Sequence, residues 1–271
     1  MALLIVGFGR GQVPGEYGAP QALPPNDQFM ARVRAAIRID PDLQQGFTYL
    51  ERRRDVKVSA LGKVSVGPLR TFEVFPAADP ARTYKRLIAV EGKPLDPEEL
   101  RKRDAEHARD VEEQTRKEQR ESPDQRARRI EDDRQERQAI LADALAVFAT
   151  AVVGREWVYG EPAIVVTLTP RADARVSTRE GNWMKHFQGR ARFVERDAQF
   201  AGFDMAAMDD VSIGWGIVGR LHKGSRLVVE RRPVDGIWLP ARLSFTATGK
   251  TLMFRAFSLD VASEYFQYKR K

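Results

Sequence analysis

The fold is decided by the last third of the chain, which opens with Phe187-Gln-Gly-Arg-Ala-Arg-Phe-Val-Glu-Arg196. From 187 to 193, apolar or small residues at odd positions alternate with polar residues at even positions. A period of two is typical of a β-strand with one face on a core and the other in water. The alternation returns in residues 226–232 and 239–247, and turns are expected at 233–236 and 248–250. This stretch therefore predicts a meander of antiparallel strands with one wet face.

More strands are expected elsewhere in the chain. Alternating segments bounded by turn residues predict three strands at 46–59, 63–75 and 83–90, and a strand pair over 157–170 that turns near Gly160. Three glycines at 214, 216 and 219 surround Trp215 and predict a sharply bent strand, because glycine within a strand often marks a bulge or a close approach.

Two segments are expected to be helical. Residues 27–39 carry an apolar stripe at helical spacing. Residues 95–150 start with Asp96-Pro-Glu-Glu99, which supplies a cap, a proline at the first helical position and an acidic first turn. Ser122-Pro-Asp-Gln125 ends that helix and caps the next. Because no apolar seam precedes Ile140, the segment predicts a pair of exposed, charged helices, either a partner-docking device or a tolerated insertion.

Several motifs in the C-terminal region resemble one group of bacterial envelope proteins. These motifs are Lys223-Gly-Ser-Arg-Leu-Val-Val-Glu-Arg-Arg232, Asp235-Gly-Ile-Trp-Leu-Pro-Ala-Arg-Leu243, Leu252-Met-Phe-Arg-Ala-Phe257 and Tyr265-Phe-Gln-Tyr268. They are similar to the outer-membrane lipoprotein-sorting proteins of the LolA/LolB type and their RseB-like relatives. The resemblance covers residues 155–268 best and 27–92 more loosely, and it leaves out the charged segment between them.

The resemblance implies the fold class: an α+β protein built on a curved antiparallel half-barrel. A helix at its N-terminal end would cover the concave, apolar side, and a long charged helical hairpin would be inserted at 95–150. We therefore expect one such domain over 26–271 after a Gly/Pro-rich leader at 1–25. The apolar run Leu3–Phe8 is either the remnant of a signal peptide or a disordered or edge-strand N-terminus.

An apolar concavity is the candidate site. Odd-numbered apolar residues of the C-terminal strands would line one face of the sheet, with the 27–39 helix above it. The alternative is that the same side chains form a filled core beneath the helix. The predicted ligand-binding residues are Phe29, Val33, Ile37, Phe193, Trp215, Leu227, Val229, Leu243 and Phe245.

The sequence offers little catalytic or metal-binding chemistry. The three histidines, His107, His186 and His222, have no metal-ligand spacing, and no nucleophile elbow or phosphate loop occurs. Asp209 and Asp210 are adjacent, so on a strand they would point to opposite faces. The absence of cysteine excludes disulfides, thiolate metal sites and a lipidated cysteine in these residues. We therefore expect no catalytic residues, no metal and no cofactor.

The charge distribution bears on partners. The net charge is +7, but residues 95–138 carry an excess of acids over bases, so the β-rich remainder is strongly basic. This predicts an acidic partner such as an anionic lipid or nucleic acid. Because the arginines alternate with apolar residues along strands and no nucleic-acid motif is present, a solvated sheet face is preferred to specific nucleic-acid binding.

These observations and the resemblance together predict a non-catalytic periplasmic protein that binds a lipid, an acyl chain or a lipoprotein. The alternative is an envelope sensor that docks a protein partner through the helical segment. The periplasmic location assumes a truncated signal peptide at the start of the chain.

Overall fold

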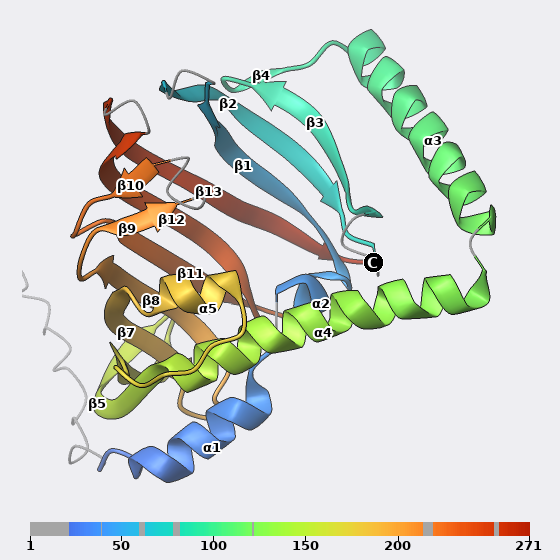
Figure 1. Cartoon of the computed structure of the whole chain (residues 1–271). Helices are drawn as coiled ribbons and strands as arrows, with labels where there is room; N and C mark the ends of the chain where they lie inside the picture. The colour runs from blue at the N-terminus through green and yellow to red at the C-terminus, as the bar shows by residue number, and fades with distance from the viewer. Residues whose placement is uncertain are drawn as a thin grey trace, which may run out of the picture.

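The computed structural model describes residues 22–38, 40–59, 63–77, 82–120, 122–213, 219–251 and 255–271. The possible signal-peptide remnant and Trp215 lie outside the described residues. So do residues 252–254, where the alternation of Leu252, Phe254 and Ala256 also predicts a strand. The described chain forms a mixed α+β structure around one antiparallel sheet of thirteen strands (Figure 1). The strand order is β4-β3-β2-β1-β13-β12-β11-β8-β7-β6-β5, and the short strands β9 and β10 pair beside one end of β12.

The three strands predicted before the charged segment are confirmed and, with a short fourth strand, form a first meander. Its strands pair antiparallel, each with the next along the chain. Buried residues alternate with less buried ones at the start of the first strand, as a half-wet strand requires. The strands are β1 (Phe47–Val58), β2 (Val64–Phe75), β3 (Tyr84–Val90) and β4 (Lys93–Pro94).

The second meander contains the strands predicted from the C-terminal third. The predicted strand pair at 157–170 is part of a longer hairpin. Its second strand lies between two other strands and is buried over Ala163–Val166. The strands are β5 (Phe148–Val158), β6 (Glu161–Pro170), β7 (Phe187–Val194), β8 (Phe200–Ala207), β9 (Val211–Ile213), β10 (Gly219–Leu221), β11 (Arg226–Val234), β12 (Ile237–Thr251) and β13 (Ala256–Arg270).

The two meanders join where the first strand meets the last. β1 pairs with β13 in antiparallel register, with Glu51 opposite Tyr265 and Arg53 opposite Ser263. The edge strands β4 and β5 therefore lie at opposite ends of an open sheet.

The charged helical segment carries the chain from one edge of the sheet to the other. It consists of α3 (Pro97–Arg120) and α4 (Pro123–Val147), and the second helix begins with the predicted capping box, in which Ser122 and Gln125 bond reciprocally. The two helices diverge at this turn, and α4 crosses in front of the sheet, so a helical hairpin is not confirmed (Figure 1). The predicted helix also ends too late, since Phe148 already starts β5.

Contacts at the outer end of the first meander hold α3. The Tyr84 ring stacks on the His107 ring with centroids 3.6 Å apart, and its hydroxyl donates to Asp104 at 2.8 Å. Arg86 also pairs with Asp104 at 2.7 Å. Burial, followed by the hydrogen bond to Asp104, raises the pKa of Tyr84 to about 12. α3 is thus fixed to β3 although most of its described side chains are exposed.

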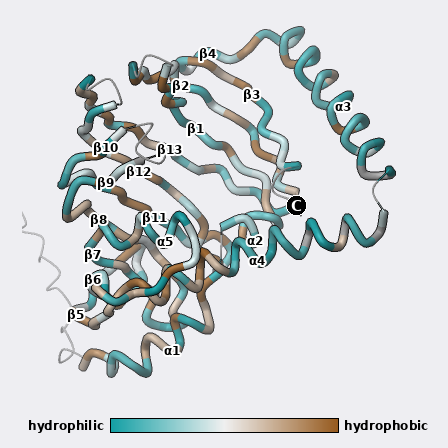
Figure 2. Tube along the Cα trace, in the orientation of Figure 1, coloured by the Kyte–Doolittle hydropathy of each residue, from teal (hydrophilic) through white to brown (hydrophobic). Residues whose placement is uncertain are grey.

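The main core lies where the first helix meets the other edge of the sheet. α1 (Asn26–Ala36) buries Phe29, Met30 and Val33 against Ile164 and Phe193. Figure 2 shows hydrophobic residues in this region and a mainly hydrophilic α3. The helix ends three residues before the predicted boundary at 39, and a short second helix, α2 (Asp40–Gln44), follows.

Two local predictions were wrong. Residues 248–250 form no turn but lie inside β12, where Gly249 lets the carbonyl of Arg220 and the ring of Phe257 approach closely. Residues 171–181 are mainly polar, which predicts a loop, but α5 (Arg179–Met184) begins there. Its start is capped by Thr178, whose hydroxyl accepts from the N–H of Gly181 at 2.9 Å.

Candidate ligand-binding cavity

A cavity of about 520 Å³ lies between the second meander and the helices above it. Its floor is the face of β5–β12 on which Phe193, Phe203 and Phe245 project. Its other walls come from α1, from the last turns of α4 and from α5. Almost all lining side chains are apolar, so the cavity disfavours a charged ligand group and offers dispersion contacts to an apolar ligand.

The structure places the nine predicted residues in different settings. Five line the cavity: Val33, Ile37, Phe193, Leu227 and Phe245. Phe29 lies in the core next to the cavity, with its ring edge-on to Phe193 at 6.4 Å. Val229 and Leu243 pair across β11 and β12 on the cavity face but lie outside its lining, and Trp215 lies outside the described residues.

The part of the lining that α4 and α5 provide was not predicted from the sequence. Ala144 and Leu145 of α4 and Trp183 and Met184 of α5 all face the cavity. The apolar residues near the end of the charged segment, including Leu145, indicate that its last turns are amphipathic. The neighbouring sequence does not indicate that these turns lie over the sheet. α5 has only six residues, too few to produce a helical period.

A buried carboxylate fixes α5 to α4. Asp143 of α4 is almost fully buried and accepts hydrogen bonds from the backbone N–H groups of Ser177 and Thr178 at 3.0 and 2.7 Å, and from the Thr178 hydroxyl at 2.6 Å. Burial acts to raise the pKa of Asp143, but these hydrogen bonds outweigh it and hold the pKa below its usual value. Position 181 requires glycine, because a Cβ there would lie 2.4 Å from the Asp143 carboxylate.

A second buried charge supports the sheet near the cavity. Arg231 of β11 is almost fully buried, donates to the carbonyl of Trp238 at 3.2 Å and pairs with Asp40 of α2. Its guanidinium lies 4.9 Å from the ring centroid of Phe200, a lining residue. Burial lowers the pKa of Arg231 to about 10, so it stays charged at neutral pH.

Among the residues that the structure describes, two charged side chains take part in the lining. Arg34 of α1 and Glu180 of α5 belong to helices that cover the cavity. His186 pairs with Asp209 at 2.8 Å, but this pair is exposed and does not line the cavity. Among the described residues, no group of His, Cys, Asp or Glu side chains is arranged to hold a metal ion.

Comparisons with known proteins add no homologue. The chain matches no protein-family model, no curated protein and no solved structure. No helix in the described part of the chain has the length and apolarity to span a membrane.

Proposed function

We propose that the protein is a non-catalytic binding protein for an acyl chain, carried free, on a lipid or on a lipidated protein. The observation that supports this most directly is the apolar cavity of about 520 Å³ beneath α1, α4 and α5. Small-molecule sites typically enclose about 300–1,000 Å³ and are mainly apolar. In this proposal the open sheet acts as a half-barrel whose concave side receives the chain.

The energetics favour a hydrocarbon guest. Each buried methylene contributes about 0.8 kcal/mol, and an apolar wall gains nothing from a polar guest that loses its hydrogen bonds to water. The resemblance to lipoprotein-sorting proteins supports the same ligand class and a periplasmic site of action as part of this proposal.

The test fills the cavity from one wall. Ala144 lines the cavity, so Ala144→Trp would occupy the space that the chain needs. With the purified protein and the neutral apolar dye N-phenyl-1-naphthylamine, we expect saturable fluorescence that dodecanoate displaces. Because the indole would exclude several methylenes, the affinity of Ala144→Trp should fall about tenfold or more.

Ala146→Trp is the matched control, because Ala146 lies on the same helix but is exposed. It should bind the dye like the parent protein. If the folded parent protein binds neither dye nor dodecanoate, or if both tryptophan variants bind equally well, the proposed function is wrong.

A further inference from the structure

A charged cluster lies on the face of the sheet that bears the cavity, but outside the cavity. It consists of Glu51, Arg53, Asp55, Arg70 and Lys85 from β1, β2 and β3. Lys85 Nζ lies 2.7 Å from Glu51 Oε2, Arg70 Nη1 lies 2.7 Å from Asp55 Oδ2, and Arg53 Nε lies 3.1 Å from Asp55 Oδ1. Arg53 also pairs with Glu51. Three cations thus share two carboxylates, and the cluster keeps one positive charge.

The strand register connects this cluster to the cavity. Phe203, which lines the cavity, is opposite Val229, Val229 is opposite Leu243, Leu243 is opposite Ser263, and Ser263 is opposite Arg53. Directly opposed residues on antiparallel strands project on the same face. Leu243 and Arg53 are two strands apart, about 10 Å at the usual strand spacing. A continuous row therefore leads from the apolar cavity over Leu243 to the cations.

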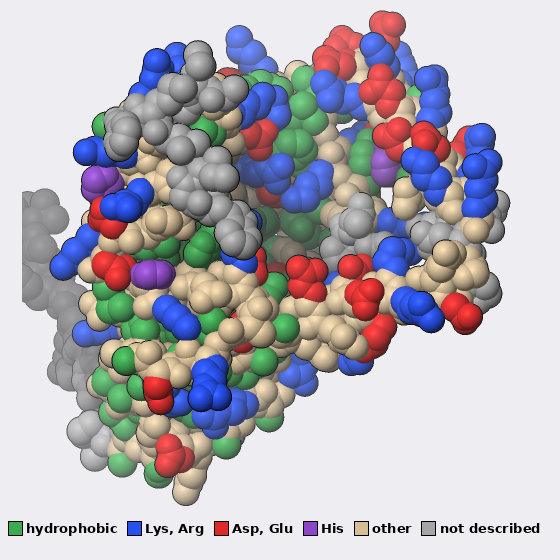
Figure 3. Space-filling model, viewed as in Figure 1, with side chains coloured by type: hydrophobic (Ala, Val, Ile, Leu, Met, Phe, Trp, Pro, Cys, Tyr) green, Lys and Arg blue, Asp and Glu red, His purple; other side chains and the backbone are tan. Residues whose placement is uncertain are grey.

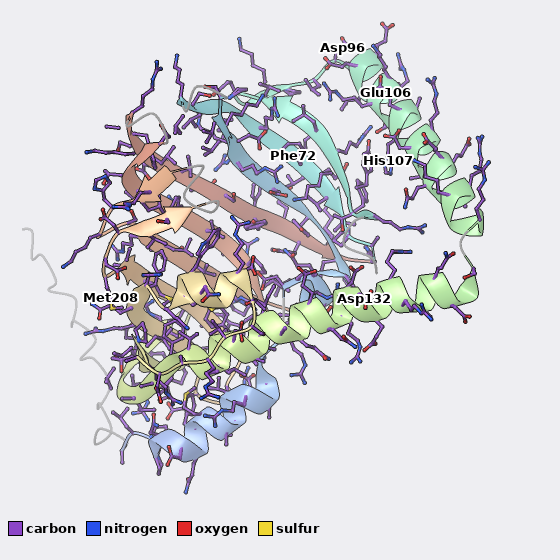
Figure 4. All side chains as sticks on the ribbon, in the orientation of Figure 1. Phe72, Asp96, Glu106, His107, Asp132 and Met208 are labelled. Atoms are coloured by element: carbon purple, nitrogen blue, oxygen red, sulfur yellow. The ribbon has the colours of Figure 1, made fainter. Side chains whose placement is uncertain are left out.

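This row is open to solvent at the cluster. Leu243 is 37% exposed, which is unusual for a leucine on an inner face, and the side chains of Arg53, Arg70 and Lys85 are also partly exposed. Figure 3 shows a hollow over this part of the sheet, lined by both hydrophobic and cationic side chains. Phe72 lies in the part of the sheet that α3 and α4 frame (Figure 4). The Arg53 guanidinium stacks on the Phe72 ring, 5.0 Å from its centroid. α4, which borders the hollow on one side, carries both acidic and basic side chains (Figure 3).

From this arrangement we propose that the protein binds an anionic amphiphile, with its chain in the cavity and its carboxylate or phosphate head beside Arg53, Arg70 and Lys85. The inference rests on the proposed function and specifies its ligand class. A guanidinium has five N–H donors and an ammonium three, so pairing with Glu51 and Asp55 leaves donors that can reach an anion. Hydrogen bonds between charged partners are stronger than those between neutral groups, so they would fix the position of the head group.

The test compares head groups on one chain length. Dodecanoate, dodecyl phosphate and dodecanol compete with N-phenyl-1-naphthylamine for the parent protein and for Arg70→Met. Arg70 is chosen because Asp55 keeps Arg53 as a partner when Arg70 is removed. We expect the two anions to bind at least about tenfold more weakly to Arg70→Met, as the loss of one hydrogen bond to a charged group predicts, and dodecanol to bind unchanged. Lys85→Met serves as the second variant, with circular dichroism to verify that each variant is folded.

Arg190→Met is the matched control. Arg190 carries the same charge on β7, but it alternates with the cavity-lining Ala191 and so projects on the opposite face. An equal loss in Arg190→Met, or a loss for dodecanol as large as for the anions, would overturn the anionic-head site while leaving chain binding intact. Failure of all three compounds to bind the parent protein would remove the proposed function itself.

Vesicles identify the source of the anion. The protein is mixed with vesicles that contain labelled phosphatidylglycerol or labelled phosphatidylcholine, and lipid transfer to the protein is measured. If more phosphatidylglycerol than phosphatidylcholine is transferred, and Arg70→Met transfers less of it, the site is supported with a membrane lipid as its ligand. Binding of dodecanoate without transfer of either lipid would support it with a free fatty acid as the ligand.

Discussion

A single buried carboxylate holds one wall of the cavity in place. Asp143 joins α4 to the loop before α5 by accepting from two backbone N–H groups and a hydroxyl. Asp143→Ala would leave those donors unpaired in a site with little water, so we expect a loss of about 2–3 kcal/mol in the free energy of unfolding, measured with urea. Asp173→Ala, an exposed carboxylate in the same loop, should change stability by less than about 0.5 kcal/mol.

The same residue predicts a pH dependence. Since the folded protein holds the pKa of Asp143 below its usual value, its contribution is complete above the unfolded pKa of about 4 and is lost as the pH falls through the folded pKa. The stability difference between the parent protein and Asp143→Ala should therefore be constant from about pH 5 to pH 8 and narrow below about pH 4. A difference that stays constant at low pH would show that the carboxylate charge has no part in it.

Among the strands, β7 and β8 approach each other too closely for a side chain at one position. A Cβ on Gly189 would lie 2.0 Å from the carbonyl oxygen of Asp204 and 2.8 Å from the Cα of Met205. Both contacts are with backbone, which cannot rotate away. Gly189→Ala should therefore destabilise the protein by about 3 kcal/mol or more, as measured by urea unfolding.

The control for this prediction is Gly154→Ala in β5. A Cβ there would meet nothing within 4 Å, and the backbone needs no left-handed conformation. The substitution should leave stability unchanged within about 0.5 kcal/mol or raise it slightly, because alanine restricts the unfolded chain. Equal losses at the two glycines would contradict the close approach of β7 and β8.

Over the whole molecule, strand pairing rather than the connecting helices should hold the two meanders together. The covalent link runs through α3 and α4, but the pairing of β1 with β13 joins the sheet along most of both strands. If a specific protease site is inserted immediately before Ser122 and cut, we expect the two fragments to co-elute in size-exclusion chromatography and to separate only in denaturant.

Arg52→Pro provides the contrast for the cut protein. Arg52 is exposed and lies in β1 between β2 and β13, where proline removes a ladder hydrogen bond without removing core packing. Because α1 of the N-terminal fragment still packs on β6 and β7, the cut fragments of this variant should separate at a lower urea concentration than the cut parent fragments. Separation of the parent fragments in native buffer would show that the helical connection, not the β1–β13 pairing, keeps the meanders together.

Local sequence patterns determined the elements. The alternation around Phe193, the strands before the charged segment and the capping box at Ser122 were all predictable, because each depends on residues within a few positions of one another. Five of the nine predicted site residues line the cavity for the same reason: alternation sorts a strand's side chains by face.

Only the tertiary structure decided which strands became neighbours and what covered them. The pairing of β1 with β13 joins residues more than two hundred positions apart. Because α4 crosses in front of the sheet, the end of the charged segment contributes Ala144 and Leu145 to the cavity wall. The cluster around Arg53 looked like a solvated strand surface until the register placed it in one row with Leu243. A local pattern specifies the face on which a side chain projects, but the neighbours it meets there depend on long-range packing of the whole chain.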